Sequence, residues 1–155
     1  MKRLLFLSLL FLSCAAMRST GTEWEPPIPE TLGDLKTFLR WKMEYKADPL
    51  WGLWDVKQTV NQMNAQLKKN SIIIGDCEDY ATYAGYMLQR MGYTRVHRVV
   101  FLRGHQICAF CIDGGWSYFS TGRYAEGPFA SINAAVKHCS RINGWKTDEI
   151  YLMME

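Results

Sequence analysis

The chain has 155 residues, 48 % of them hydrophobic and 14 % aromatic, and a formal net charge of +3. This length and apolar content allow one buried core, so a single folded domain is expected. The basic residues are scattered and form no stripe, which argues against nucleic acid as a partner.

Residues 1–16 have the pattern of an export signal peptide. A charged start, Met1-Lys2-Arg3, precedes an apolar run over residues 4–12 that is too short to span a bilayer. Small residues after this run permit ordinary signal cleavage, while Leu12-Ser13-Cys14 resembles a bacterial lipobox with Cys14 as the lipidated residue. Both routes predict export, either as a periplasmic or cell-envelope lipoprotein held to the membrane by its N-terminal lipid, or as a secreted protein. A buried hydrophobic N-terminal helix is the alternative.

Residues 17–30 are expected to be a Pro-rich linker, because Pro26-Pro27-Ile28-Pro29 is stiff and extended. The folded domain is therefore expected over residues 31–155.

Apolar residues at helical spacing predict a helix over residues 31–45 and a second helix from Asp55 through Leu67. Asp48-Pro49 breaks the first helix. The aromatic turn Trp51-Gly52-Leu53-Trp54, which follows, is expected to pack in the core rather than to bind a ligand.

A third helix is predicted from Cys77 to Met91, with Asp76 as its N-cap and Gly92 as its stop. This places the Cys77 thiol in the first turn, where unpaired N–H groups favour a thiolate and can also donate to an oxyanion. The neighbouring carboxylates of Asp76, Glu78 and Asp79 act in the opposite direction and raise the pKa of a thiol.

After Gly92 the apolar period changes from about 3.6 to 2, which indicates strands. Strands are expected over residues 95–102, 105–112 and 116–120, a helix over 131–139 and a final strand over 149–153. Asp113-Gly114-Gly115 is a strong hairpin signal. Helices followed by antiparallel strands predict an α+β domain with its helices on one face of the sheet.

Cys77 requires a base, and His105, at the start of a predicted strand, is the best-placed candidate. The two residues are interpreted as a nucleophile and its base. The backbone N–H of Cys77 is expected to help bind an oxyanion, with Gln58 and Asn64 as candidates for a second donor.

The stretch Gly75-Asp76-Cys77-Glu78-Asp79-Tyr80-Ala81 resembles the nucleophile motif of bacterial transglutaminase-like cysteine peptidases, in the transglutaminase-like superfamily of papain-related architecture. The resemblance runs from about Leu35 to Ser120 and includes Tyr45, Asp48, Trp51-Gly52 and Trp54-Asp55. It implies a nucleophile on a helix N-terminus packed on a small antiparallel sheet, a catalytic Cys and His followed by an Asp, and no cofactor. It also implies a peptide or protein substrate attacked at a peptide, isopeptide or glutamine side-chain amide.

The third catalytic residue departs from the family pattern. Ser120 stands where the resemblance implies an Asp, and its hydroxyl is a candidate acceptor for the ring N–H of His105. Asp113 is the nearest acid, but eight extended residues separate it from His105 by roughly 25 Å. Asp113 is therefore expected to serve only the turn.

A zinc site is the competing interpretation, because His105, Cys108 and Cys111, joined by His138 or Cys139, are ligand types that zinc accepts. Cys108 and Cys111 lie in an alternating strand and should point to opposite faces, so no metal site is predicted. A disulfide from Cys139 to one of them stays open.

The acids around Cys77 and the two remaining histidines are not expected to form further sites. A calcium site at Asp76, Glu78 and Asp79 is disfavoured because helix capping accounts for these acids. His97 and His138 are expected to be solvated.

The sequence therefore predicts an exported cysteine hydrolase or acyl transferase that uses Cys77 and His105, with Ser120 at the expected Asp position. The alternative is a catalytically inactive domain of the same fold that binds a partner in the cell envelope. Ser120 and the many aromatic residues motivate this second hypothesis.

Overall fold

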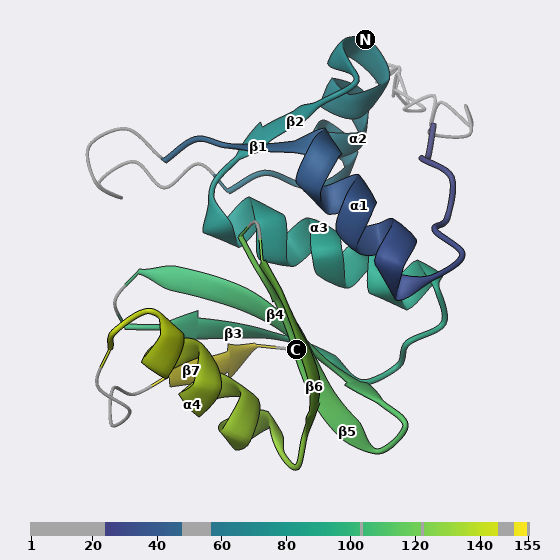
Figure 1. Ribbon diagram of the computed structural model, residues 1–155. Coiled ribbons are helices and arrows are strands. Elements are labelled where there is room, and N and C mark those ends of the chain that lie inside the picture. Colours follow the sequence, from purple (N-terminus) through teal and green to yellow (C-terminus); the bar gives the residue numbers. More distant parts are fainter. Residues whose placement is uncertain (1–23, 48–56, 103, 122, 146–150, 155) are drawn as a thin grey trace, which may run out of the picture.

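The computed structural model describes residues 24–47, 57–102, 104–121, 123–145 and 151–154 (Figure 1). In chain order the elements are α1 (Leu32–Lys42), β1 (Met43–Tyr45), α2 (Val60–Asn70), β2 (Ile73–Gly75), α3 (Cys77–Arg90), β3 (Val96–Phe101), β4 (His105–Ile112), β5 (Gly115–Ser120), β6 (Arg123–Phe129), α4 (Ile132–Ile142) and β7 (Tyr151–Met154). The protein is α+β, as predicted. The predicted signal peptide with Cys14, the aromatic turn and the predicted start of the second helix lie outside the described residues.

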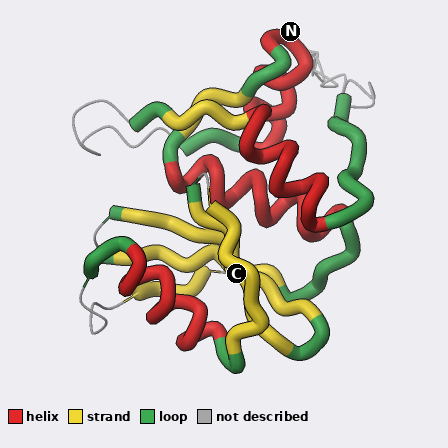
Figure 2. Tube along the Cα trace, in the orientation of Figure 1, coloured by secondary structure: helices red, strands yellow, loops and turns green. Residues whose placement is uncertain are grey.

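The elements form two sheets. β1 and β2 pair in parallel as a two-stranded sheet, and the other five strands form an antiparallel sheet in the order β6-β5-β4-β3-β7. Figure 2 shows α1, α2, α3 and the small sheet gathered on one side of the large sheet, with α4 apart from them. None of the described helices is both long enough and apolar enough to cross a membrane.

Side chains alternate between the two faces of the large sheet, and the described ones on each face pack into a separate core. Cys108, Phe110 and Phe119 belong to the core that contains α1, α2 and α3. Ile107 and Tyr118 belong to a second core that contains α4. The prediction that the helices cover one face was therefore wrong for α4, whose apolar stripe packs on the opposite face.

The first predicted helix is shorter than expected. It ends at Lys42, and Met43 takes an extended conformation with φ −118° and ψ 118°. The following residues form β1, which pairs with Ile73–Gly75. The β-branched run before Cys77 supplies this partner strand, and local periodicity around residue 43 carries no sign of it.

Two other boundaries differ from the prediction. α2 begins at Val60, after a capping box between Thr59 and Gln62, so residues 57–59 are not helical. β6 was not predicted, and it extends the sheet by pairing with β5.

The end of the predicted linker contacts the domain. Arg90, the last residue of α3, donates from Nη1 to the Pro26 carbonyl at 2.8 Å, and its Nη2 lies 3.2 Å from Glu25 Oε2. Residues 25–26 therefore lie against the C-terminal end of α3, which is the end opposite Cys77.

Candidate active site

Asp76 caps the helix that begins at Cys77, as predicted. One of its carboxylate oxygens accepts from the backbone N–H groups of Glu78, at 2.8 Å, and Asp79, at 3.2 Å. The Asp79 carboxylate accepts in return from the backbone N–H of Asp76, at 3.4 Å, which completes a capping box. Cys77 therefore lies in the first turn, and it is 8 % exposed.

Asp79 also fixes the segment that precedes α2. Its two carboxylate oxygens accept from the backbone N–H and from Nε2 of Gln58, at 3.0 and 2.6 Å. Gln58 Nε2 donates in addition to the Ile74 carbonyl at 2.8 Å. Both hydrogens of this amide are thus engaged, and the suggestion that Gln58 is an oxyanion donor was wrong.

Asn64 is also unsuited to that role. It is 5 % exposed, and its Oδ1 accepts from the Tyr83 hydroxyl at 2.8 Å. Tyr83 follows Cys77 by six residues, or about 9 Å along the helix axis. Asn64 therefore belongs to the core beside the middle of α3.

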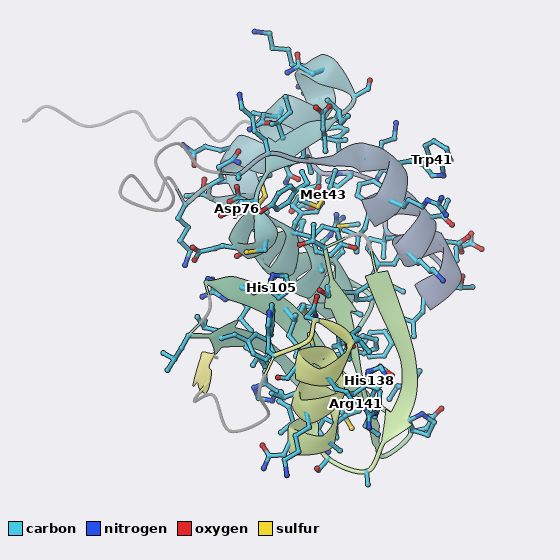
Figure 3. The ribbon with its side chains drawn as sticks, turned by 60° about the vertical axis from the view of Figure 1, so that its left-hand side comes forward. Trp41, Met43, Asp76, His105, His138 and Arg141 are labelled. Carbon is cyan, nitrogen blue, oxygen red and sulfur yellow. The ribbon has the colours of Figure 1, made fainter. Side chains whose placement is uncertain are left out.

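The Cys77 sulfur lies against the first residues of β4. Its thiol donates to the Gly104 carbonyl over 3.7 Å, and the backbone N–H of Gln106 is directed at the sulfur. These two backbone groups flank His105 in the sequence. Figure 3 shows Asp76, at the start of α3, and His105, at the start of β4, on the same side of the molecule.

His105 and Ser120 are in direct contact. His105 Nε2 lies 2.9 Å from Ser120 Oγ, and Ser120 is 4 % exposed. The His105 ring is half-buried against Phe101 and Trp145, with ring centroids 6.1 and 5.4 Å away. The contact leaves Nδ1 as the ring nitrogen available to a thiol.

The strand register explains why the thiol donates to Gly104 and not to His105. His105 pairs with Phe101, which belongs to the core on the α4 face of the sheet. α3 packs on the other face. The Cys77 thiol therefore contacts the backbone at the start of β4, whereas the His105 imidazole contacts Ser120.

Burial makes the neutral forms of both groups the resting forms. It raises the pKa of the Cys77 thiol above 9.0, and the charges of Asp76 and Glu78 add to this rise. The backbone N–H groups of Gln106 and Cys77 lower the pKa of the thiol, but burial and the two carboxylates have the larger effect. Burial also lowers the pKa of His105 below 6.5. The prediction that the helix N-terminus would favour a thiolate is thus outweighed by desolvation.

The three acids around Cys77 have separate structural roles. Asp76 caps α3 and Asp79 binds Gln58, as described above. The third, Glu78, is paired with Lys57, whose Nζ lies 2.9 Å from Glu78 Oε1. No group of three or more His, Cys, Asp or Glu side chains in the described part of the chain is arranged to hold a metal ion.

Asp113 is a turn residue, as predicted. It has φ +49° and Gly114 has φ +79°, and together they connect Ile112 to its partner Gly115. This two-residue turn lies at the end of β4 opposite His105.

The described cysteines are thiols and not disulfides. Cys108 belongs to the core of the α3 face, whereas Cys111 packs against the core of the α4 face, as their spacing predicts. Cys139 is buried in α4. The disulfide left open for Cys139 is therefore not formed.

His97 and His138 are half-buried, so the prediction that they are solvated was wrong. His138 Nδ1 lies 3.0 Å from the Tyr118 hydroxyl, and its ring centroid lies 4.9 Å from that of Phe129. The His97 ring lies 5.5 Å from that of Trp116. Trp116 and Tyr118 alternate along β5, and this alternation was the signal in the sequence that an apolar surface would cover the rings of His97 and His138.

A pocket lies beside the start of α3, and sequence reasoning did not find it. The end of α1, strand β1 and the residues directly before Cys77 form it, and its lining is mainly apolar. Thr121, which follows Ser120, also lines the pocket, and its buried Oγ1 has no hydrogen-bond partner. Two residues that line the pocket, Asp76 and Thr121, are therefore the sequence neighbours of Cys77 and Ser120.

No family model matches this chain, and no curated protein matches it either.

Proposed function

We propose that the protein is an exported, membrane-tethered cysteine hydrolase or acyl transferase with a transglutaminase-like, papain-like fold. One observation carries this proposal: the sulfur of Cys77, at a capped helix N-terminus, contacts the backbone on both sides of His105. The contact between His105 and Ser120 supports it, because it orients the imidazole that would act as base.

In the proposed reaction, Cys77 Sγ attacks the carbonyl carbon of an amide and its proton passes to His105 Nδ1. The carbonyl oxygen takes up the negative charge, and the backbone N–H of Cys77 donates to it. The C–N bond then breaks, the imidazolium gives its proton to the leaving amine, and a thioester on Cys77 remains. Water resolves the thioester in a hydrolase, and an acceptor amine resolves it in an acyl transferase.

The resting thiol must turn for this step, because it donates to the Gly104 carbonyl. With a neutral thiol and a neutral imidazole, proton transfer accompanies the attack and does not precede it. His105 then acts as a general base in the manner of the serine hydrolases.

The neighbouring pocket supports a peptide or protein substrate. Apolar side chains such as Leu39, Met43 and Tyr80 line it, together with Asp76, the residue directly before the proposed nucleophile. An apolar side chain of the substrate would occupy this pocket while the adjacent carbonyl meets the sulfur.

A second candidate function is the inactive domain that binds an envelope partner. The observation that favours it is the direction of the two pKa shifts, since a raised thiol pKa and a lowered imidazole pKa both oppose an ion pair. Ser120 in place of an acid also opposes an ion pair, because a serine brings no negative charge to stabilise the imidazolium.

Acylation by p-nitrophenyl acetate separates the two functions, because this ester needs no specific recognition. A full-length Cys14→Ser protein would be incubated with the ester, and acetylated cysteines would be mapped by mass spectrometry. We expect acetyl transfer to Cys77 with release of p-nitrophenolate, and loss of this transfer in Cys77→Ala and His105→Ala. His138→Gln is the matched control, because His138 lies on α4, and it should behave as the parent protein. An unmodified Cys77 under conditions that acetylate Cys111 would favour the binding module.

A further inference from the structure

Gln106 is a buried polar residue with an unpaired atom. It is the second residue of β4 and is 9 % exposed, yet its side-chain Oε1 is buried without a hydrogen-bond partner. Buried side-chain oxygens are nearly always paired, so an exception calls for an explanation.

The position of Gln106 relates this atom to the nucleophile. Strand alternation puts Gln106 on the same face as Cys108 and Phe110, which is the α3 face and opposite to His105. The backbone N–H of Gln106 already reaches the Cys77 sulfur. Its side chain therefore leaves β4 on the α3 face, at the residue whose backbone contacts the sulfur.

The backbone N–H groups that follow Cys77 in the first turn of α3 and the amides of Gln58 and Asn64 are engaged, whereas the Thr121 hydroxyl in the neighbouring pocket has no partner. The N–H groups of Glu78 and Asp79 donate to the Asp76 carboxylate, and the N–H of Tyr80 donates to the Asp76 carbonyl. Gln58 and Asn64 are engaged elsewhere. An oxyanion formed at Cys77 thus has backbone donors beside it, the N–H groups of Cys77 and Gln106 that reach the sulfur.

We propose that the side-chain amide of Gln106 is the side-chain oxyanion donor of this site, with the carbonyl group of a scissile amide or ester as its ligand. This inference rests on the proposed hydrolase function. Before substrate binds, the amide lacks a partner at Oε1. A movement of the side chain on substrate binding would bring Nε2 to the substrate carbonyl, to which it can donate.

The chemical step is acyl transfer. As the bond forms between Cys77 Sγ and the carbonyl carbon, the π electrons move to the carbonyl oxygen, which accepts from the N–H of Cys77 and from Gln106 Nε2. When the oxyanion collapses, the bond to the leaving group breaks. Alkylation of the same sulfur by iodoacetamide displaces iodide from a saturated carbon and forms no oxyanion. Gln106 should therefore matter for acylation and not for alkylation.

This difference defines the experiment. Gln106→Met removes the amide and keeps an unbranched side chain of similar length. Gln89→Met, at an exposed position of the same helix that carries Cys77, is the matched control. Each full-length variant, in the Cys14→Ser background, would be treated with p-nitrophenyl acetate and, separately, with iodoacetamide. Modification of Cys77 would be followed by mass spectrometry and folding by thermal unfolding.

We expect Gln106→Met to slow acetylation of Cys77 by about 10²-fold or more, the effect typical of losing one oxyanion donor. Alkylation should keep its rate. The unfolding temperature should not fall, because the substitution removes an unpaired buried oxygen. Gln89→Met should leave both rates unchanged.

Three results would overturn the inference. Equal losses in acetylation and alkylation would mean that Gln106 only positions the thiol. An unchanged acetylation rate would remove the donor role while leaving the hydrolase function intact. Absence of acetylation in the parent protein, with alkylation of Cys77 preserved, would overturn both. If Gln106→Met lowers the unfolding temperature, Gln106→Leu provides a second apolar replacement for the same comparison of rates.

Discussion

His105 Nε2 and Ser120 Oγ are 2.9 Å apart, although the two residues are fifteen positions apart on neighbouring strands. A hydroxyl thus occupies the place beside the imidazole where the proposed transglutaminase-like family would imply a carboxylate. A serine can orient the ring, but it gives an imidazolium no opposite charge.

Replacing Ser120 tests this relationship. Ser120→Asp should raise the pKa of His105, because a carboxylate beside the ring stabilises its charged form, and it should accelerate acetylation of Cys77. Ser120→Ala should slow acetylation several-fold, as expected for one lost hydrogen bond of about 1 kcal/mol. The pKa of His105 would be measured by NMR titration.

Ser117→Ala is the control for these two variants. Ser117 is a buried serine on the same strand, and its hydroxyl accepts from the backbone N–H of Gly127. The Ser117→Ala variant should leave the titration of His105 unchanged. An unaltered His105 pKa in Ser120→Asp would mean that the contact has no electrostatic role.

The raised pKa of Cys77 predicts a distinctive alkylation profile. The rate of reaction with iodoacetamide should still rise above pH 9.0, the ordinary pKa of a thiol, because burial and nearby carboxylates raise the pKa further. A plateau below about pH 8.5 would show instead that an ion pair with His105 exists at rest.

The same shifts predict how stability depends on pH. The lowered pKa of His105 gives a stabilising contribution that is present above pH 6.5 and lost as the pH falls through the lower, folded value. The raised pKa of Cys77 gives one that is present below pH 9.0 and lost as the pH rises through the higher, folded value. Chemical denaturation across this range should show the largest free energy of unfolding between the two limits. Cys77→Ala should reduce the loss of stability on the alkaline side, to which Cys108 also contributes because burial raises its pKa to about 12. His105→Ala should reduce the loss on the acidic side.

Gly75 is required by the packing of Asp79. A Cβ added at Gly75 would lie 2.5 Å from Asp79 Oδ2 and 2.6 Å from Asp79 Cβ. Gly75→Ala should therefore cost about 1–3 kcal/mol, typical of overpacking, and should disturb the bonds from Asp79 to Gln58. Urea denaturation measures the change.

Gly33→Ala is the matched comparison. It lies on exposed α1, where an added Cβ would meet only Thr31 Oγ1 at an ordinary 3.5 Å. The substitution should stabilise by about 0.5–1 kcal/mol, because alanine restricts the unfolded chain. Equal effects at the two glycines would contradict the packing explanation.

Local patterns were enough to predict most of the fold. Asp76 before Cys77 is a strong helix start, and Asp113-Gly114 between alternating strands is a strong hairpin signal, and both are present. β1 could not be predicted in this way, because it exists only through its pairing with β2. Met43, for example, pairs with Ile73, which lies 30 residues later in the chain. α4 was predicted as a helix, but which face of the sheet it covers depends on tertiary packing.

The candidate site, like the fold, could be predicted from the sequence only in part. Its residue types could be read from the sequence, and Ser120 was placed beside His105 because the family resemblance implies an acid at that position. The protonation states could not be read in this way, because burial sets the pKa values of Cys77 and His105 and a sequence does not show burial. Gln106 was missed because a glutamine in a strand carries no signal until the partner of its amide is known.

Arg90 is expected to hold residues 25–26 on the domain. Arg90→Ala removes the bond to Pro26 and the pair with Glu25, so hydrogen exchange in residues 24–31 should accelerate. Acetylation of Cys77 should not change, because Arg90 lies at the other end of α3. Arg141→Ala, at an exposed position of α4, is the control and should leave this exchange unchanged. Protection of residues 24–31 that survives Arg90→Ala would show that other contacts hold the segment.

The contact at Arg90 also determines how the domain would respond to force. α3 has 14 residues and is about 20 Å long, with the sulfur at one end and this contact at the other. Tension transmitted through the N-terminal segment would load Arg90 and the last turn of α3 first. The end that carries Cys77 would keep its geometry until the helix itself unfolded, so the proposed site would not be distorted if the molecule were tethered and pulled.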